Sequence, residues 1–134
     1  MNRIFGIILL IFLVMGTETS MAQQNNPVIT QVHKAIREAD ATTLATYFQS
    51  TVDLELGDTD GNFSRKQAEM IVRDFFSREP AKSFTIKHQG ASDDGSKYSI
   101  GAYLTKAGKE YRVYILLKGS DEGLRVNQLQ FEED

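Results

Sequence analysis

The spacing of apolar residues predicts three helices in the first part of the chain. The first begins at Asn26-Pro27, where an N-cap side chain is followed by a residue suited to a first helical turn. The second is short and begins at Asp40. The third begins at Ser64, which can form a capping box with Gln67, and it ends before Pro80. Each helix has apolar residues three or four positions apart, so each is expected to lay one face on a core.

An alternation of apolar and polar residues predicts five strands, one before the third helix and four after it. The first covers residues 52–56, and a polar turn over residues 58–62 follows it. The other strands begin near residues 84, 97, 110 and 124 and are joined by short turns. In the last strand the apolar positions change phase after Val126, which predicts a β-bulge near Asn127-Gln128.

This order of elements predicts an α+β fold. Helices that come early, followed by an antiparallel meander of strands, are expected to gather on one face of the sheet. Because a bulge bends a long strand, the antiparallel sheet is expected to curve around the N-terminal helices. The expected product is a cone-shaped domain with an interior cavity.

The N-terminal residues predict a secretory signal peptide rather than a membrane anchor. The apolar run from Ile4 to Met15 contains 12 residues, whereas a membrane-spanning helix needs roughly 20. Ser20 and Ala22 then form a small-x-small cleavage site. We therefore expect cleavage of residues 1–22, a single domain over residues 23–134 without a membrane anchor, and a periplasmic or secreted location.

The composition limits the partners of this domain. The net charge is −3 at pH 7, whereas nucleic-acid-binding domains usually carry a basic patch, so no nucleic-acid partner is expected. The chain contains no cysteine, which excludes disulfides and lipid attachment through a cysteine. His33 has polar neighbours and is expected to be solvated. Because His33 and His88 lie far apart without clustered carboxylates, no metal site and no cofactor are expected.

Several segments resemble a family of small exported proteins of Gram-negative bacteria. They are residues 64–69, 75–76, 84–90, 98–101 and 111–114. These segments are similar to the uncharacterised family called domain of unknown function 4783. The order of elements resembles the nuclear transport factor 2-like, or cystatin-like, cone fold. The resemblance extends over nearly all of residues 23–134; it implies the cone fold and export, and it brings no known catalytic residues.

A cavity inside the cone is the first candidate site. The residues expected to line it are Phe84, Ile86, His88, Tyr98, Ile100, Tyr111 and Val113. Such a cavity would hold a small apolar ligand. Alternatively, His88 acts with a tyrosine as a general base in isomerase or dehydratase chemistry, although no carboxylate is clearly placed beside it. A structural His88 with both ring nitrogens hydrogen-bonded is the third interpretation.

The outer face of the sheet is the second candidate site. The residues expected on it are Tyr103, Arg112, Tyr114 and Leu116. Tyrosine, leucine and arginine together are typical of a protein interface. Cone-fold proteins often dimerise through this face, so a homodimer or a contact with another cell-envelope protein is expected. A solvated face with scattered aromatic residues is the alternative.

One acidic segment imitates the ligand spacing of a calcium-binding loop: Asp58, Asp60, Asn62 and Glu69. Phe63 occupies the position that needs glycine, so a polar turn is the better interpretation. No motif identifies a reaction. The sequence therefore predicts an exported binding or accessory module, and it leaves open whether an apolar ligand, a protein partner, a small enzyme or a structural dimer explains it.

Overall fold

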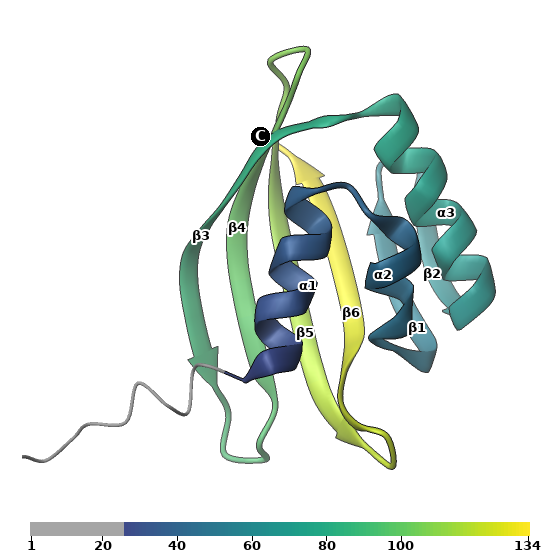
Figure 1. Cartoon of the computed structure of the whole chain (residues 1–134), viewed down its shortest axis with the longest axis vertical. Coiled ribbons are helices and arrows are strands. Elements are labelled where there is room, and N and C mark those ends of the chain that lie inside the picture. The colour runs from purple at the N-terminus through teal and green to yellow at the C-terminus, as the bar shows by residue number, and fades with distance from the viewer. Residues whose placement is uncertain (1–25) are drawn as a thin grey trace, which may run out of the picture.

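The computed structural model describes residues 26–134, which form three helices against one side of a six-stranded sheet (Figure 1). In chain order the elements are α1 (Pro27–Arg37), α2 (Ala41–Thr46), β1 (Phe48–Leu56), β2 (Thr59–Ser64), α3 (Arg65–Arg78), β3 (Ala81–Ala91), β4 (Lys97–Thr105), β5 (Glu110–Ser120) and β6 (Gly123–Glu133). The predicted signal peptide lies outside the described residues. No helix within residues 26–134 has the length and apolar character needed to cross a bilayer.

The strands follow the order β2-β1-β6-β5-β4-β3 across the sheet. β1 runs parallel to β6, and every other neighbouring pair is antiparallel. The predicted α+β class and the curved sheet around the helices are confirmed (Figure 1). The prediction of a wholly antiparallel sheet is wrong at the β1–β6 pair. Local alternation predicts that a strand exists but not its neighbour, and the last strand inserts between β1 and β5.

The segment after β1 also differs from the prediction. The sequence predicts a polar turn over residues 58–62, but the turn is confined to Gly57-Asp58 and β2 follows at once. Gly57 has a φ of 59°, a left-handed conformation that glycine adopts at little cost. β2 is an edge strand whose alternate side chains are exposed. Its polar residues therefore look like a loop in the sequence.

The predicted helix starts are confirmed. Asn26 Oδ1 accepts a hydrogen bond from the Val28 N–H at 2.8 Å, and Asp40 Oδ1 accepts one from the Thr43 N–H at 3.1 Å. The capping box of α3 is complete, because the side chains of Ser64 and Gln67 each accept from the other residue's backbone N–H at 3.2 Å. Each cap satisfies amides that have no partner within the helix, which explains why the helices begin at these residues.

The predicted bulge in the last strand is also confirmed. The register between β5 and β6 shifts after Leu116, so Gln128 pairs with Leu116 and Val126 pairs with Leu117. Asn127 is the extra residue. Its insertion returns the following apolar residues, Leu129 and Phe131, to the core face that Val126 occupies.

The core lies between the helices and the concave face of the sheet (Figure 1). At one end it holds a cluster of five aromatic rings: Phe75, Phe76, Tyr103, Tyr111 and Phe131. Neighbouring ring centroids in this aromatic cluster are 4.9–6.4 Å apart, and most pairs meet edge to face. Each of the five residues is at most 5% exposed. The aromatic cluster therefore packs α3 firmly against β4, β5 and β6.

Candidate functional site

The face of β4 that points toward the helices is the opposite of the predicted one. Its helix-facing residues are Ser99, Gly101, Tyr103 and Thr105, all buried. Tyr98 and Ile100, predicted to line the interior cavity, lie on the outer face and are half-buried. The cross-strand partners agree, because Tyr103 pairs with the buried Tyr111, whereas Ile100 pairs with Tyr114.

The close approach of neighbouring elements explains the reversed face of β4. A Cβ atom on Gly101 would lie 2.7 Å from Cε1 of Phe84 and 2.8 Å from the carbonyl oxygen of Thr85. Ser99 Oγ lies 2.8 Å from His33 Nε2 on α1. Only small side chains fit at these two positions. The larger apolar residues of β4 therefore occupy the outer face. The sequence had suggested the reverse, because most apolar residues of this strand lie on that face.

His88 also lies on the outer face, and it is exposed. The register of β3 against β4 shifts, so that Ile86 pairs with Gly101 but His88 pairs with Ile100. Lys87 is the inserted residue, and one extra residue turns every later side chain to the other face of a strand. The prediction that His88 faces an interior cavity is therefore wrong. The general-base hypothesis loses the apolar surroundings on which it depended.

The residues predicted to line one cavity are thus divided between the two faces of the sheet. Phe84, Tyr111 and Val113 are buried on the helix-facing side, and Ile86 packs against the same core. His88, Tyr98 and Ile100 lie on the other side. At one end of the cone, the aromatic cluster fills the space between α3 and the sheet. The predicted cavity lining therefore does not come together.

The outer face of β4 and β5 carries instead a set of adjacent apolar residues, here named the apolar strip. It consists of Tyr98, Ile100, Ala102, Leu104, Tyr114 and Leu116, all half-buried. Cross-strand pairing joins its two rows, with Tyr98 opposite Leu116 and Ile100 opposite Tyr114. Tyr114, Leu116 and Arg112 were predicted on this face and lie there. Tyr103 was also predicted there, and this is wrong because Tyr103 is 0% exposed within the core.

Charged residues of opposite sign flank the apolar strip. On one side, the edge strand β3 carries the exposed residue Lys87. On the other side, β6 carries Glu132 and β1 carries Glu55, both exposed. Arg112 lies on β5 opposite Glu132, at the border between the strip and the acidic side. The outer face is therefore apolar in the middle and acidic on one side, with a basic opposite edge.

A buried polar pair between α1 and β4 was missed by the sequence analysis. His33 was predicted to be solvated, but it is only 8% exposed, and its Nε2 lies 2.8 Å from Ser99 Oγ. Burial, and to a smaller extent the charge of Arg37, lower the pKa of His33 from 6.5 to about 4, so the ring is neutral at pH 7. Ser99 is 2% exposed, so it is not an accessible nucleophile. The available signal was position, because His33 follows the buried Ile29 by four residues.

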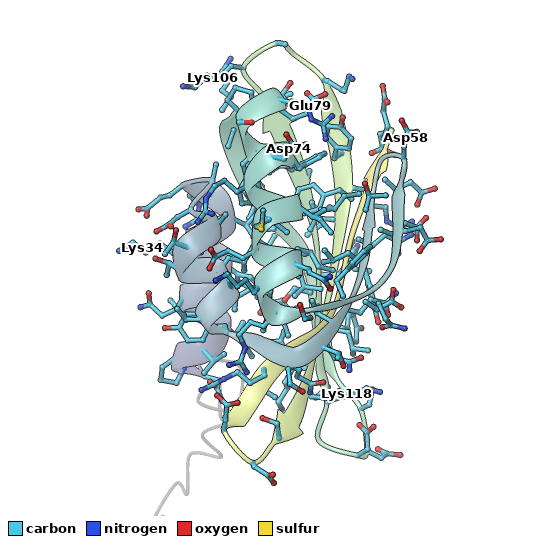
Figure 2. The ribbon with its side chains drawn as sticks, turned by 90° about the vertical axis from the view of Figure 1, so that its right-hand side faces the viewer. Lys34, Asp58, Asp74, Glu79, Lys106 and Lys118 are labelled. Carbon is cyan, nitrogen blue, oxygen red and sulfur yellow. The ribbon has the colours of Figure 1, made fainter. Side chains whose placement is uncertain are left out.

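A second polar cluster closes the end of the core at Glu79, the residue that caps α3 (Figure 2). Tyr103 Oη donates to the Glu79 carbonyl oxygen at 2.7 Å, and Tyr111 Oη donates to Glu79 Oε1 at 3.1 Å. Lys109 Nζ lies 3.2 Å from the same carboxylate oxygen. Burial raises the pKa of Tyr103 and of Tyr111, and the nearby Glu79 raises both further. Both hydroxyls therefore stay protonated and act as anchors that join α3 to the sheet.

Comparison with known proteins identifies the family of the chain. The sequence profile of DUF4783, a domain of unknown function, matches residues 29–132. The chain belongs to the DUF4783 family. A solved DUF4783 structure from Bacteroides uniformis is 26% identical with a TM-score of 0.73, covering 78% of this chain and 95% of that chain. Another from Bacteroides ovatus is 24% identical with a TM-score of 0.72, covering 78% and 93%.

The predicted fold is confirmed by these DUF4783 structures and by a more distant protein. A domain of unknown function with a cystatin-like fold from Nostoc punctiforme is 14% identical with a TM-score of 0.65, covering 87% of this chain and 80% of that chain. No protein with a curated functional description matches the sequence. The nuclear transport factor 2-like fold of this DUF4783 protein is therefore established, while the function of the family is unknown.

The acidic segment of this DUF4783 protein does not form a calcium loop. Asp58 lies in a tight turn, whereas Asp60 and Asn62 lie on the extended strand β2, so the backbone does not curve around an ion. Among residues 26–134, no group of three His, Cys, Asp or Glu side chains is placed to hold a metal ion. The apolar strip is therefore the feature from which a function can be argued.

Proposed function

We propose that this protein is a non-catalytic binding module that pairs with a second copy of itself through the apolar strip. The observation that carries the proposal is the row of large apolar side chains on the sheet face opposite the helices. In a two-layer fold this face is open to solvent and usually carries polar residues. Contiguous apolar residues on such a face are typical of a protein interface.

The charges beside the apolar strip favour a second copy as the partner. A two-fold axis that runs between β4 and β5 would lay the apolar strip of one copy on the apolar strip of the other and would exchange β6 with β3. The acidic side, with Glu132 on β6, would then lie over the basic edge, with Lys87 on β3. A symmetric interface must be complementary to itself, and a face that is apolar in the middle with opposite charges at its sides meets this requirement.

The test is the mass of the protein in solution, measured by sedimentation equilibrium. We expect a dimer for the unchanged chain and a monomer for Ile100→Lys, because a lysine in the middle of the apolar strip would be desolvated without a partner. Met70→Lys is the matched control, since Met70 is 61% exposed on α3, away from this face. A monomeric unchanged chain would overturn the proposal, and so would an Ile100→Lys dimer of unchanged strength.

The proposal includes export, which rests on the apolar run and the cleavage site near Ala22. Expression of residues 1–134 in a Gram-negative host should yield a protein in the periplasm or the medium whose first residue is Gln23. Retention of residues 1–22 on a cytoplasmic or membrane-bound product would contradict it. Changing Ala22 to a bulky residue should block cleavage while leaving the domain unchanged.

A further inference from the structure

The two edges of the sheet differ in how well they resist the addition of another strand. β3 has two register shifts against β4, around Lys82 and around Lys87, and both lysines are exposed. Bulges and lysines are the usual devices that keep an edge strand from pairing. β2 pairs with β1 in one unbroken register and contains neither lysine nor proline. The β2 edge therefore lacks these protective features.

The free backbone groups of β2 follow from the two-residue turn at Gly57-Asp58. In such a hairpin the residues beside the turn, Leu56 and Thr59, form a hydrogen-bonded pair, and bonded and non-bonded pairs then alternate. Asp60 and Asn62 belong to non-bonded pairs, so their N–H and C=O groups point away from β1. Ser64 has the same phase, and its N–H donates outward to Gln67 Oε1 at 3.2 Å. The outward groups of Asp60 and Asn62 thus form the template for one more strand.

An apolar groove lies beside this edge. It has a volume of about 260 Å³ and is lined by Phe63, Gln67, Met70 and Ile71, from β2 and α3. Phe63 and Ile71 pack against the core, whereas Met70 is 61% exposed. A strand added about 4.8 Å beyond β2 would direct every second side chain toward this groove, on the side where Phe63 points.

The charges around the β2 edge select the partner. Asp58 lies at the tip of the β1–β2 hairpin (Figure 2), and Asp60 is directly opposite Glu55 on β1. All three carboxylates are exposed. A second copy of β2 would bring the same carboxylates against each other, which destabilises strand pairing. A strand with lysine or arginine on its outer face would instead neutralise them.

We propose that the β2 edge binds an extended segment of another protein in which apolar and basic residues alternate. The segment pairs with the outward backbone groups of Asp60 and Asn62, and its apolar side chains enter the groove beside Met70. Its basic side chains lie next to Asp60 and Glu55. This is strand addition to a sheet edge, in which the main chain provides affinity and the alternate side chains provide specificity. It is independent of the apolar strip, which lies on the outer face of β4 and β5.

The test uses a fluorescein-labelled synthetic peptide of eight alternating lysine and valine residues, with fluorescence anisotropy as the readout. Binding to protein expressed from residues 1–134 is expected in the micromolar range, and it should weaken as salt is added. Two control peptides carry glutamate in place of lysine, or N-methyl groups on alternate amides of the pairing edge. Each should bind at least about tenfold more weakly.

Protein variants test the site itself. Asn62→Pro removes an outward N–H without breaking a bond to β1, and Met70→Lys places a charge in the groove; each should weaken binding about tenfold or more. Asn62→Thr and Lys82→Ala, the latter on the opposite edge, should leave binding unchanged. If Asn62→Pro does not fold, Met70→Lys still decides the question.

Three results would overturn the proposal. The first is the absence of peptide binding to the unchanged chain. The second is equal binding by the N-methylated peptide or by Met70→Lys. The third is a dimer that dissociates in the Asn62→Pro variant but not when the peptide is added to the unchanged chain. The occupant of the β2 edge would then be a second copy of the chain.

Discussion

The two faces of β4 show that the more apolar side of a strand is not always the buried one. The outer face carries Tyr98, Ile100 and Leu104, and the helix-facing side carries Ser99 and Gly101 in addition to Tyr103. The buried side contains small residues because α1 and Phe84 come close to the strand there. Hydrophobicity indicates whether a residue favours a buried position. The distance to the next layer decides which side chains are small enough to fit at that position.

The largest expected effect on the free energy of unfolding comes from shortening a side chain of the aromatic cluster. A shortened side chain on the outer face provides the comparison. Phe131→Ala should lower the free energy of unfolding by about 3–5 kcal/mol, because it leaves a cavity among four other rings. Tyr114→Ala should lower it by less than about 1 kcal/mol when the protein is monomeric. Urea denaturation at low protein concentration measures both. Equal losses would mean that the outer face is covered within a single chain.

A side chain added to the crowded face of the sheet should have the next largest effect. Gly101→Val would force a contact with Phe84 and with the Thr85 carbonyl oxygen, and we expect a loss of roughly 3 kcal/mol. Gly119→Val is the matched control, because no atom lies within 4 Å of a Cβ at that position. Its effect should stay within about 0.5 kcal/mol by the same measurement. A tolerated Gly101→Val would show that α1 and β3 can move away from β4.

Acid should destabilise the helix-facing side through His33. The pKa of His33 is about 4 in the folded protein and 6.5 when the chain is unfolded, so between these values the unfolded chain binds a proton that the folded protein does not. The free energy of unfolding should therefore fall as the pH drops from about 6.5 to about 4, by on the order of 2 kcal/mol. Below that range, this residue causes no further loss.

The pH effect is measured by urea denaturation from pH 7 to pH 4, with His33→Gln beside the unchanged chain. Glutamine can keep a hydrogen bond to Ser99 but does not titrate. The variant should lose the part of the pH dependence that His33 causes. His88→Gln is the control, because His88 is exposed on the outer face. Identical pH profiles for His33→Gln and the unchanged chain would contradict the buried neutral state.

The smallest effect is expected on the solvent side of the helix layer. Arg78 Nε and Asp74 Oδ2 lie 3.0 Å apart at the end of α3, with side chains 61% and 66% exposed. Water and ions screen such a pair, so Arg78→Ala should change the free energy of unfolding by less than about 0.5 kcal/mol. A larger loss in urea denaturation would indicate a role for Arg78 in the packing of α3.

Part of the candidate site could be predicted, and part could not. Arg112, Tyr114 and Leu116 were assigned to the outer face because β5 alternates regularly with its large apolar residues inside. His88 was assigned to the wrong face because the bulge at Lys87 leaves no mark in the residue pattern. The bulge at Asn127 could be predicted, since it lies between apolar residues whose phase visibly changes. A bulge among polar residues has no such signal.

The sequence by itself determined the helix starts, most of the strands, the α+β class and the family resemblance. These depend on local features, such as the side chain that caps a helix or the period of the apolar residues, which act over a few positions. Only the tertiary structure decided which face of β4 is buried, where His88 and His33 lie, and that β6 runs beside β1. Those outcomes depend on how closely separate segments approach one another, and that distance is set by packing among residues far apart in the chain.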